Sequence, residues 1–248
     1  MELKVLGSNS AGNCYILSND QESLIIECGV RFDAIQKGLG FDLSMVSGCL
    51  ISHEHGDHCK GVKDVMAKGI TVYASAGTFR GMKIESSHHR ASVIIPGKQF
   101  QVGSFKIIPF DVKHDAQQPV GFLINHSETG TILFVTDTYY VENTFRGLNN
   151  IIVECNYSQE ILDRKMKAGA TPDFLRNRIF KSHMNLKTCK ELLQANDLTA
   201  VNKIVLIHLS DSNSNAVEFQ KEITAVTGKQ VYVAEAGLVI KNFNKTPF

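Results

Sequence analysis

The stretch that decides the fold is Ser52-His53-Glu54-His55-Gly56-Asp57-His58, in which four side chains able to bind a metal ion fall within six residues. Imidazole nitrogens and carboxylate oxygens are ligands for borderline divalent metals. Because the chain has only 9 histidines, chance would produce the pattern H-x-H-x-D-H on the order of once in a thousand such sequences. Three neighbouring imidazoles without a ligand would also repel each other when protonated. The segment therefore predicts a metal centre.

The spacing within this cluster indicates two ions. A strand predicted over residues 46–51 leads into the cluster. In extended backbone, side chains two residues apart point the same way, so His53 and His55 can bind one ion. After a turn, Asp57 and His58 can face a second ion.

Two ions need more ligands than the cluster supplies, and three further candidates each follow an apolar strand. The predicted strands cover residues 105–110, 131–135 and 203–207, and the candidates that follow them are His114, Asp137 and His208. Loops at strand ends carry chemistry on a rigid scaffold. One such residue alone would be unremarkable, but the recurrence at three strand ends favours a shared site.

The order of the predicted elements indicates an α/β fold. Apolar runs between turn residues predict strands at residues 3–6, 14–17, 24–27, 46–51, 71–73, 92–95, 105–110, 121–124, 131–135, 151–154, 203–207 and 230–233. Helical spacing predicts helices at residues 31–39, 60–67, 159–168, 172–180, 186–194 and 216–227. With no linker or repeat, the order predicts one domain over residues 1–248, with two sheets covered by helices on their outer faces.

The composition excludes some classes of protein and leaves others open. Lys and Arg number 26 against 25 acidic residues, so a nucleic-acid substrate would need a local basic patch. No stretch approaches the roughly 18 apolar residues that span a bilayer, and the first residues lack the apolar region of a signal peptide. We therefore expect a soluble, cytoplasmic protein without a membrane partner. The six cysteines are scattered, which predicts reduced, mostly buried thiols.

The ligand pattern resembles the metallo-β-lactamase superfamily, in order and across nearly the whole chain. The resemblance implies a four-layer αββα sandwich. It also implies that His53, His55 and His114 hold one ion, that Asp57, His58 and His208 hold the other, and that Asp137 bridges them. The family's first motif usually has an aspartate where this chain has Glu27, which leaves the role of Glu27 open.

Several phrases resemble one branch of the family, the bacterial WalJ/YycJ/VicX group. They are Gly7-Ser8-Asn9-Ser10-Ala11-Gly12-Asn13-Cys14, the histidine cluster, His114-Asp115-Ala116 with Pro119-Val120-Gly121, Ser182-His183-Met184-Asn185 and His208-Leu209-Ser210. That group is associated with phosphodiester cleavage, notably 5′→3′ exonuclease action on DNA. The resemblance therefore implies a metal-dependent phosphodiesterase with DNA as its substrate.

The chemistry of a two-metal site agrees with this interpretation. Two ions lower the pKa of a shared water to give hydroxide near neutral pH, and they clamp the oxygens of an in-line displacement at phosphorus. Asp57 or Asp137 could relay the proton from that water. Imidazole-rich ligands favour zinc, and manganese suits the same donors. Two alternatives remain: a small-molecule hydrolase that cleaves a cyclic phosphodiester, thioester or lactam, and a binding module that has lost turnover.

His183 is a candidate catalytic residue outside the ligand set. It precedes Asn185, a plausible N-cap of the helix at residues 186–194, and helix N-termini bind phosphate through free amides. We hypothesise that His183 and the start of this helix at Asn185 hold or protonate the scissile phosphate. Arg176 and Arg178 precede this segment and are candidates for the basic patch. A second basic cluster, His88-His89-Arg90, is interpreted as a surface loop.

Overall fold

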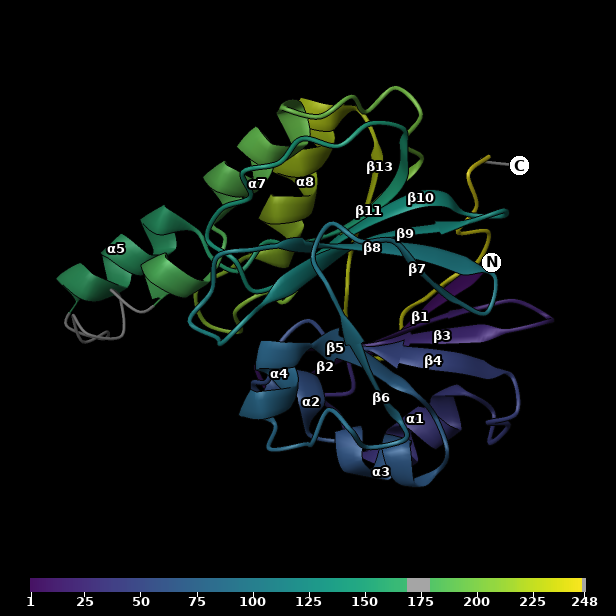
Figure 1. The fold of residues 1–248 in the computed structure, drawn as a ribbon. Helices are drawn as coiled ribbons and strands as arrows, with labels where there is room; N and C mark the ends of the chain where they lie inside the picture. Colours follow the sequence, from purple (N-terminus) through teal and green to yellow (C-terminus); the bar gives the residue numbers. More distant parts are fainter. Residues whose placement is uncertain (169–178, 247–248) are drawn as a thin grey trace.

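Two seven-stranded β-sheets lie face to face at the centre of the protein (Figure 1). This computed structural model describes residues 1–168 and 179–246. The first sheet has the order β14 (Val239–Ile240), β1 (Glu2–Asn9), β2 (Gly12–Ser18), β3 (Ser23–Ile26), β4 (Val46–Leu50), β5 (Val72–Ser75) and β6 (Ala91–Ile94). The second has the order β13 (Gln230–Val233), β12 (Lys203–Ile207), β11 (Leu148–Glu154), β10 (Gly130–Val135), β9 (Val120–His126), β8 (Phe105–Asp111) and β7 (Phe100–Val102).

Helices cover the outer face of each sheet. The first sheet carries α1 (Phe32–Gly38), α2 (Gly56–Cys59), α3 (Val62–Ala67) and α4 (Ala76–Gly81), and the second carries α7 (Leu186–Gln194) and α8 (Ala216–Thr227), with α5 (Gln159–Lys167) farther out (Figure 1). One apolar cluster fills the space between the sheets, and two others lie under the two helical layers. The predicted four-layer αββα sandwich is confirmed.

The parallel strands position the candidate ligands. In the second sheet β10, β11 and β12 are parallel, and in the first sheet β3 is parallel to β4. The central parallel strands are continuous apolar runs because both of their faces are buried. Their carboxyl ends lie at one edge of each sheet, and the chain leaves these ends directly into the histidine cluster, Asp137 and His208.

Some predicted boundaries are wrong, for identifiable reasons. The helix predicted over residues 60–67 begins only at Val62, and the separate short helix α2 precedes it, carrying Asp57 and His58. The sequence did not predict α4, since its two glycines disfavour a helix, nor the short strands β7 and β14. Most of the helix predicted over residues 172–180 lies outside the described residues.

Two further expectations concern the cysteines and the membrane. All six cysteines are free and buried, as predicted. Within residues 1–168 and 179–246, none of the helices combines the length and the apolar character needed to cross a membrane.

Candidate metal centre

Three residues around the candidate site have backbone conformations that are rare for non-glycine residues. Glu27, Asp137 and His208 have φ angles of 63°, 42° and 53°. Glu27 directly follows the buried strand β3 and His208 directly follows β12. One threonine separates Asp137 from the end of the buried strand β10. Such left-handed backbone costs free energy and persists where surrounding contacts hold it, often at functional sites. Here it turns each side chain as the strand ends.

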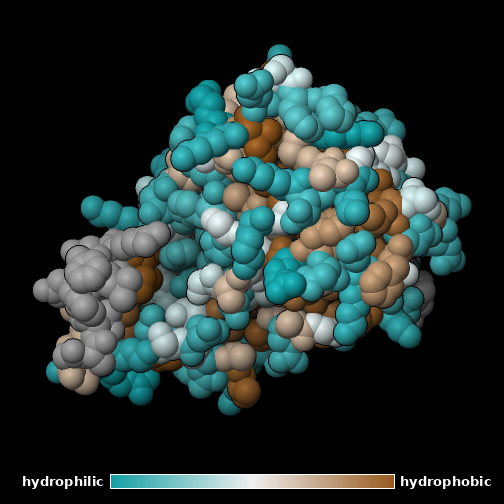
Figure 2. All heavy atoms as spheres, turned by 90° about the horizontal axis from the view of Figure 1, so that it is seen from below, coloured by the Kyte–Doolittle hydropathy of each residue, from teal (hydrophilic) through white to brown (hydrophobic). Residues whose placement is uncertain are grey.

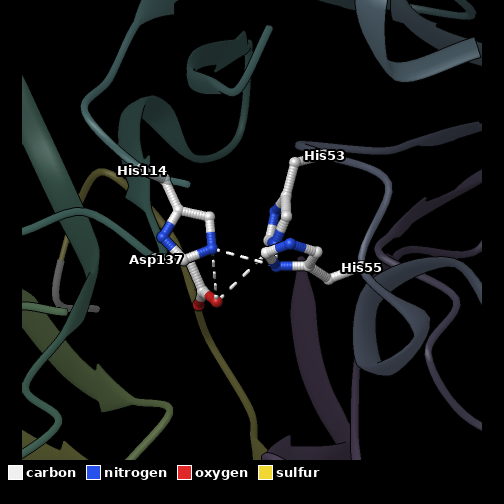
Figure 3. A group of neighbouring side chains, drawn as sticks. All are labelled: His53, His55, His114 and Asp137. Atoms are coloured by element: carbon white, nitrogen blue, oxygen red, sulfur yellow. Dashed lines mark hydrogen bonds and ion pairs between the residues drawn. The ribbon is translucent and has the colours of Figure 1, made fainter. Parts of the chain in front are cut away.

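The first group of candidate ligands contains His53, His55, His114 and Asp137, whose donor atoms lie within 4.8 Å of one another (Figure 3). Nδ1 of His55 lies 3.1 Å from Nε2 of His53 and also 3.1 Å from Nε2 of His114. Oδ2 of Asp137 lies 3.6 Å from Nε2 of His53 and 3.5 Å from Nε2 of His114. The four side chains come from three separate loops and point at one another.

The second group contains Asp57, His58, Asp137 and His208, again within 4.8 Å. Nε2 of His58 lies 3.4 Å from Oδ2 of Asp57 and 3.4 Å from Oδ2 of Asp137. Nε2 of His208 lies 3.4 Å from Oδ2 of Asp57. Asp137 therefore belongs to both groups, and its Oδ2 atom faces histidines of each. The structure thus brings together all seven candidate ligands named from the sequence.

The hydrogen bonds around the first group fit a bound cation. Nδ1 of His53 contacts the Ser52 hydroxyl at 2.9 Å, and Nδ1 of His114 contacts the Ser182 carbonyl at 2.8 Å. The Nε2 atoms of His53 and His114 therefore both face Nδ1 of His55. That nitrogen has a single position for a proton, so it cannot make good hydrogen bonds to both of them. A divalent ion satisfies such converging nitrogens, and outer partners of this kind orient histidine ligands.

The electrostatics of the first group point the same way, whereas in the second group burial alone would lower the pKa of His58 and His208 but the carboxylate of Asp137 raises it above its ordinary value. Burial, followed by the neighbouring His58, lowers the pKa of His53 well below its ordinary value, and burial also lowers that of His114. Burial alone would raise the pKa of Asp137, but His208 and His58 hold it well below its ordinary value. Neutral imidazoles and an ionised carboxylate are the protonation states that bind metals. The fold and these clusters fit a dinuclear divalent metal site.

A buried side-chain atom in the second group also makes no hydrogen bond within the described residues. Nε2 of His208 is buried without a hydrogen bond, although buried polar atoms are nearly always satisfied. On the backbone side, the His208 amide donates to the Ser8 hydroxyl at 3.0 Å. The residue is therefore fixed through its main chain, while its ring nitrogen is left for another ligand.

Glu27 lies behind His58. Its side chain has no exposed surface, and burial raises its pKa. One carboxylate oxygen accepts a hydrogen bond from the Ser52 amide at 3.0 Å, and the other lies 3.4 Å from Nδ1 of His58. Glu27 thus contacts both the strand end that leads to His53 and the outer nitrogen of His58. This geometry is that of a carboxylate that orients a histidine ligand.

His183 is held by Glu154, a residue that the sequence analysis missed. Nδ1 of His183 donates to the fully buried Glu154 carboxylate at 2.7 Å, and the Thr138 and Met184 amides donate to the same carboxylate at 3.0 and 3.1 Å. Burial alone would lower the pKa of His183, but Glu154 raises it above its ordinary value. Glu154 ends β11, so the rule that selected Asp137, a polar side chain at the end of a buried strand, applies to it as well.

The arrangement of His183 also creates a third possible ligand group. Donor atoms of Asp137, Glu154, His183 and His208 lie within 4.8 Å of one another. Because Nδ1 of His183 is engaged by Glu154, its Nε2 atom is the one available to another partner. The sequence assigns His183 to the phosphate and not to an ion, and its ring centroid lies 5.2 Å from that of His208.

A pocket of about 410 Å³ opens over these groups. Besides the candidate ligands His55, Asp57, His114, Asp137 and His208, its lining includes Ser10, Ile179, Ser182 and His183. The lining does not include Asn185, which instead caps α7 by accepting the Thr188 amide at 2.9 Å. The Asn185 prediction as an N-cap is confirmed, but the geometry does not bring Asn185 to the pocket. Arg176 and Arg178 lie outside the described residues.

Comparisons of the sequence identify related proteins. The model of the Beta-lactamase superfamily domain matches residues 31–209. Exodeoxyribonuclease YycJ of Bacillus anthracis is 28% identical over 246 residues, which cover 93% of this chain and 89% of the relative. Exodeoxyribonuclease WalJ of Streptococcus pneumoniae serotype 2, strain D39, is 27% identical over 227 residues, which cover 85% of this chain and 82% of the relative.

Solved structures share the fold at lower sequence identity. The metallo-β-lactamase fold protein YhfI from Bacillus subtilis superposes with a TM-score of 0.72 at 18% identity and covers 97% of this chain and 99% of that one. A diphosphatase from the PhnP family has a TM-score of 0.68 at 15% identity, with 96% of each chain covered. Since the family model matches well over half of the sequence, the chain belongs to the β-lactamase superfamily.

Proposed function

We propose that this protein is a metal-dependent phosphodiesterase that degrades DNA in the manner of a 5′→3′ exonuclease. The observation that carries the proposal is the position of His183, a hydrogen-bonding side chain that lines the same pocket as five candidate metal ligands. A site that holds two cations and a histidine around one cavity is suited to a phosphate group, whose oxygens accept both kinds of contact.

The seven candidate ligands have defined parts in this proposal. His53, His55 and His114 would hold one ion, Asp57, His58 and His208 the other, and Asp137 both. When bound, the two ions would activate water as a nucleophile and stabilise charge on the phosphate oxygens. Zinc is the ion we expect, because imidazoles predominate among the ligands, and manganese suits the same donors.

Two side chains of the pocket would move protons. The Asp57 side chain is 23% exposed, more open than the other second-group ligands, and can accept a proton from the attacking water. His183 would bind the scissile phosphate through Nε2 and donate a proton to the leaving oxygen. The hydrogen bond from Nδ1 to Glu154 fixes the imidazole in the orientation that this role requires.

The assignment of DNA rests on the relatives. Two curated relatives that cover most of this chain are named exodeoxyribonucleases. We expect the protein to act in the cytoplasm, because free cysteines are typical of a reducing compartment. The alternative is a small-molecule hydrolase that uses the same metals. A solved diphosphatase of similar fold supports this alternative.

The test is degradation of end-labelled substrates by the metal-depleted protein with zinc or manganese added back. Single- and double-stranded DNA and RNA of one sequence, labelled at the 5′ or the 3′ end, distinguish the nucleic acid and the polarity. We expect nucleotides to be released progressively from the 5′ end of DNA. Hydrolysis of bis-p-nitrophenyl phosphate without any degradation of nucleic acid would instead support the small-molecule hydrolase.

A further inference from the structure

The near-neutral net charge of the chain conceals an uneven distribution. Residues 60–90 contain six of the 26 Lys and Arg residues but only two of the 25 acidic residues, so this segment is net +4. The remainder of the chain is therefore net −3. The segment forms α3, β5, α4 and the loop that leads to β6. This part of the molecule offers a polyanion a surplus of positive charge.

Three exposed cations of this region have no acidic partner in the described part of the chain. Lys63, Arg80 and Lys83 are exposed, and no carboxylate among the described residues pairs with any of them. Elsewhere several surface cations are paired, as Lys190 is with Glu222 at 2.6 Å. Unpaired cations keep their full charge for a ligand and lose no existing ion pair when one binds.

Two grooves lie on either side of the segment that contains Lys83. One, of about 600 Å³, is lined by residues that include Lys63, Lys83, His88 and His89, and the other, of about 560 Å³, by residues that include Arg80 and Lys83; Glu85 is the one acidic residue that lines each groove. Figure 2, which views the molecule from below, shows that hydrophilic side chains cover most of this face. His88 accepts the Arg90 amide at its Nδ1, so its Nε2 is free to donate outward.

The helix α4 connects this surface directly to the candidate metal centre. The Gly77 amide donates to the Gln118 side chain at 3.0 Å, and the Gln117 amide donates to Glu54 at 2.8 Å. At Gly81 the backbone approaches the Glu54 side chain so closely that an added Cβ would lie 2.3 Å from its Cγ. Glu54 lies between His53 and His55, and Figure 1 shows α4 beside α2.

These contacts limit the distance between the cations and the ligands. Gly81, the neighbour of Arg80, contacts the side chain of Glu54, the neighbour of His55. Each of the two steps along the chain adds 3.8 Å between Cα atoms, so the Cα atoms of Arg80 and His55 lie at most about 15 Å apart. About four stacked nucleotides, at 3.4 Å each, span that distance. A strand whose phosphate occupies the metal centre can therefore reach Arg80 and then Lys83.

We propose that Lys63, Arg80, Lys83, His88 and His89, here called the basic tract, bind the phosphodiester backbone of the substrate strand beyond the scissile phosphate. This inference rests on the proposed function and specifies the surface that gives the enzyme its preference for a polymer. The tract contacts phosphates and not base edges, so it confers affinity and not sequence specificity.

A larger cavity suits a polyanion less well. It has a volume of about 950 Å³ and lies on the other side of the β1–β2 hairpin, where Ala11 lines this cavity and Ser10 lines the metal pocket. Its charged lining residues are Arg31, Lys60, Asp33, Asp211 and Glu235, so acids outnumber bases there. Arg31 is in addition paired with Asp33 at 3.2 Å.

The test compares two triple variants with the same change in net charge. The tract variant is Lys63→Glu/Arg80→Glu/Lys83→Glu, and the control is Lys98→Glu/Lys106→Glu/Lys241→Glu, three exposed lysines outside the tract. The probes are 3′-fluorescein oligo(dT) of 20 and of 3 nucleotides, with binding measured by anisotropy and degradation by kcat/KM across a salt series. Metal content and thermal midpoint establish that each variant is folded and loaded.

We expect the tract variant to bind the 20-mer at least about 10-fold more weakly and its salt slope to fall by about 2, since each single-strand phosphate contact contributes about 0.7. The preference for the 20-mer over the 3-mer should fall with it, while the control stays close to wild type. Equal losses in both variants, or none in the tract variant, would overturn the inference and leave the proposed function intact. A wild type that hydrolyses bis-p-nitrophenyl phosphate but neither binds nor degrades either oligonucleotide would overturn both.

Should the tract variant fail to fold, Lys63→Gln/Arg80→Gln/Lys83→Gln removes the charges without reversing them. A smaller loss in the same direction is expected. Binding of the 20-mer at wild-type strength by this variant would reject the tract.

Discussion

Nδ1 of His183 lies 2.7 Å from Oε1 of Glu154, a carboxylate that has no exposed surface. The hydrogen bond fixes which ring nitrogen of His183 can meet a ligand in the pocket. Glu154 also lies 3.2 Å from Nδ1 of His208, so one buried carboxylate orients a candidate metal ligand and a candidate phosphate-binding residue together.

His183→Ala should keep both metal ions and the fold but lose roughly 10²–10⁴-fold in kcat on bis-p-nitrophenyl phosphate, the usual range for one positioned acid or charge stabiliser. Elemental analysis and steady-state kinetics on the same preparation check this. If the variant loses an ion, His183 is a ligand, as the third donor group would allow. A full rate would mean that the phosphate is bound elsewhere.

Asp57→Ala should lower turnover by several orders of magnitude, because Asp57 belongs to the second ligand group and is the open carboxylate beside the pocket.

The reconstituted wild type should contain two equivalents of metal, and His208→Ala should contain fewer. Asp111→Ala, at an exposed carboxylate that ends β8, is the matched control. Near wild-type rates in Asp57→Ala, or less than one equivalent in the wild type, would contradict the dinuclear site.

Glu27→Gln should weaken metal binding about 10–100-fold, the usual effect of losing a partner that orients a ligand. The amide retains an oxygen for the Ser52 amide but removes the negative charge that faces Nδ1 of His58. Glu27→Asp keeps the carboxylate and should lose less. Chelator competition measures the affinity, and equal affinity in the wild type and Glu27→Gln would show that the contact only supports the fold.

Glu22→Gln should destabilise the protein by about 1–2 kcal/mol at pH 7, because Glu22 accepts hydrogen bonds from the Ser47 hydroxyl at 2.8 Å and the Ser104 amide at 3.0 Å. Burial alone would raise the pKa of Glu22, but these hydrogen bonds hold it below the ordinary value. A lowered pKa means that the stabilisation is complete above the unfolded-state pKa and is lost as the pH falls through the folded-state value. Urea unfolding at pH 7 and across the acid range should therefore show a difference that shrinks toward low pH; a difference that is constant with pH would exclude this ionisation.

The fold was predictable because its signals are local and periodic. The buried parallel strands are continuous apolar runs, and the candidate ligands Asp137 and His208 follow such runs directly. The αββα order could be derived from the succession of these elements. The short helix α2 could not, because four residues carry no helical period. For α4 the obstacle was its glycines, which are explained by the close approach of Gly77 to Gln118 and of Gly81 to Glu54.

The parts of the site that escaped prediction depend on distant contacts. Glu154 ends a strand in the same way as the chosen ligands, but its role became visible only where β11 meets the His183 segment. The N-cap at Asn185 was predictable from its position before an amphipathic helix, whereas its distance from the pocket was not. Similarly, the total charge gave no sign of the basic tract, which depends on how residues 60–90 are grouped in space.

The hydrogen bond from the His208 amide to the Ser8 hydroxyl joins residues 200 positions apart. At ribosomal rates of about 5–20 residues per second, Ser8 is made roughly 10–40 s before its partner. During that interval the nascent chain already carries the histidine cluster, yet the turn that presents His208 does not exist. Closure of the candidate centre consequently comes late in the synthesis of the chain, and until then the histidine cluster lacks the residue that completes the second ligand group.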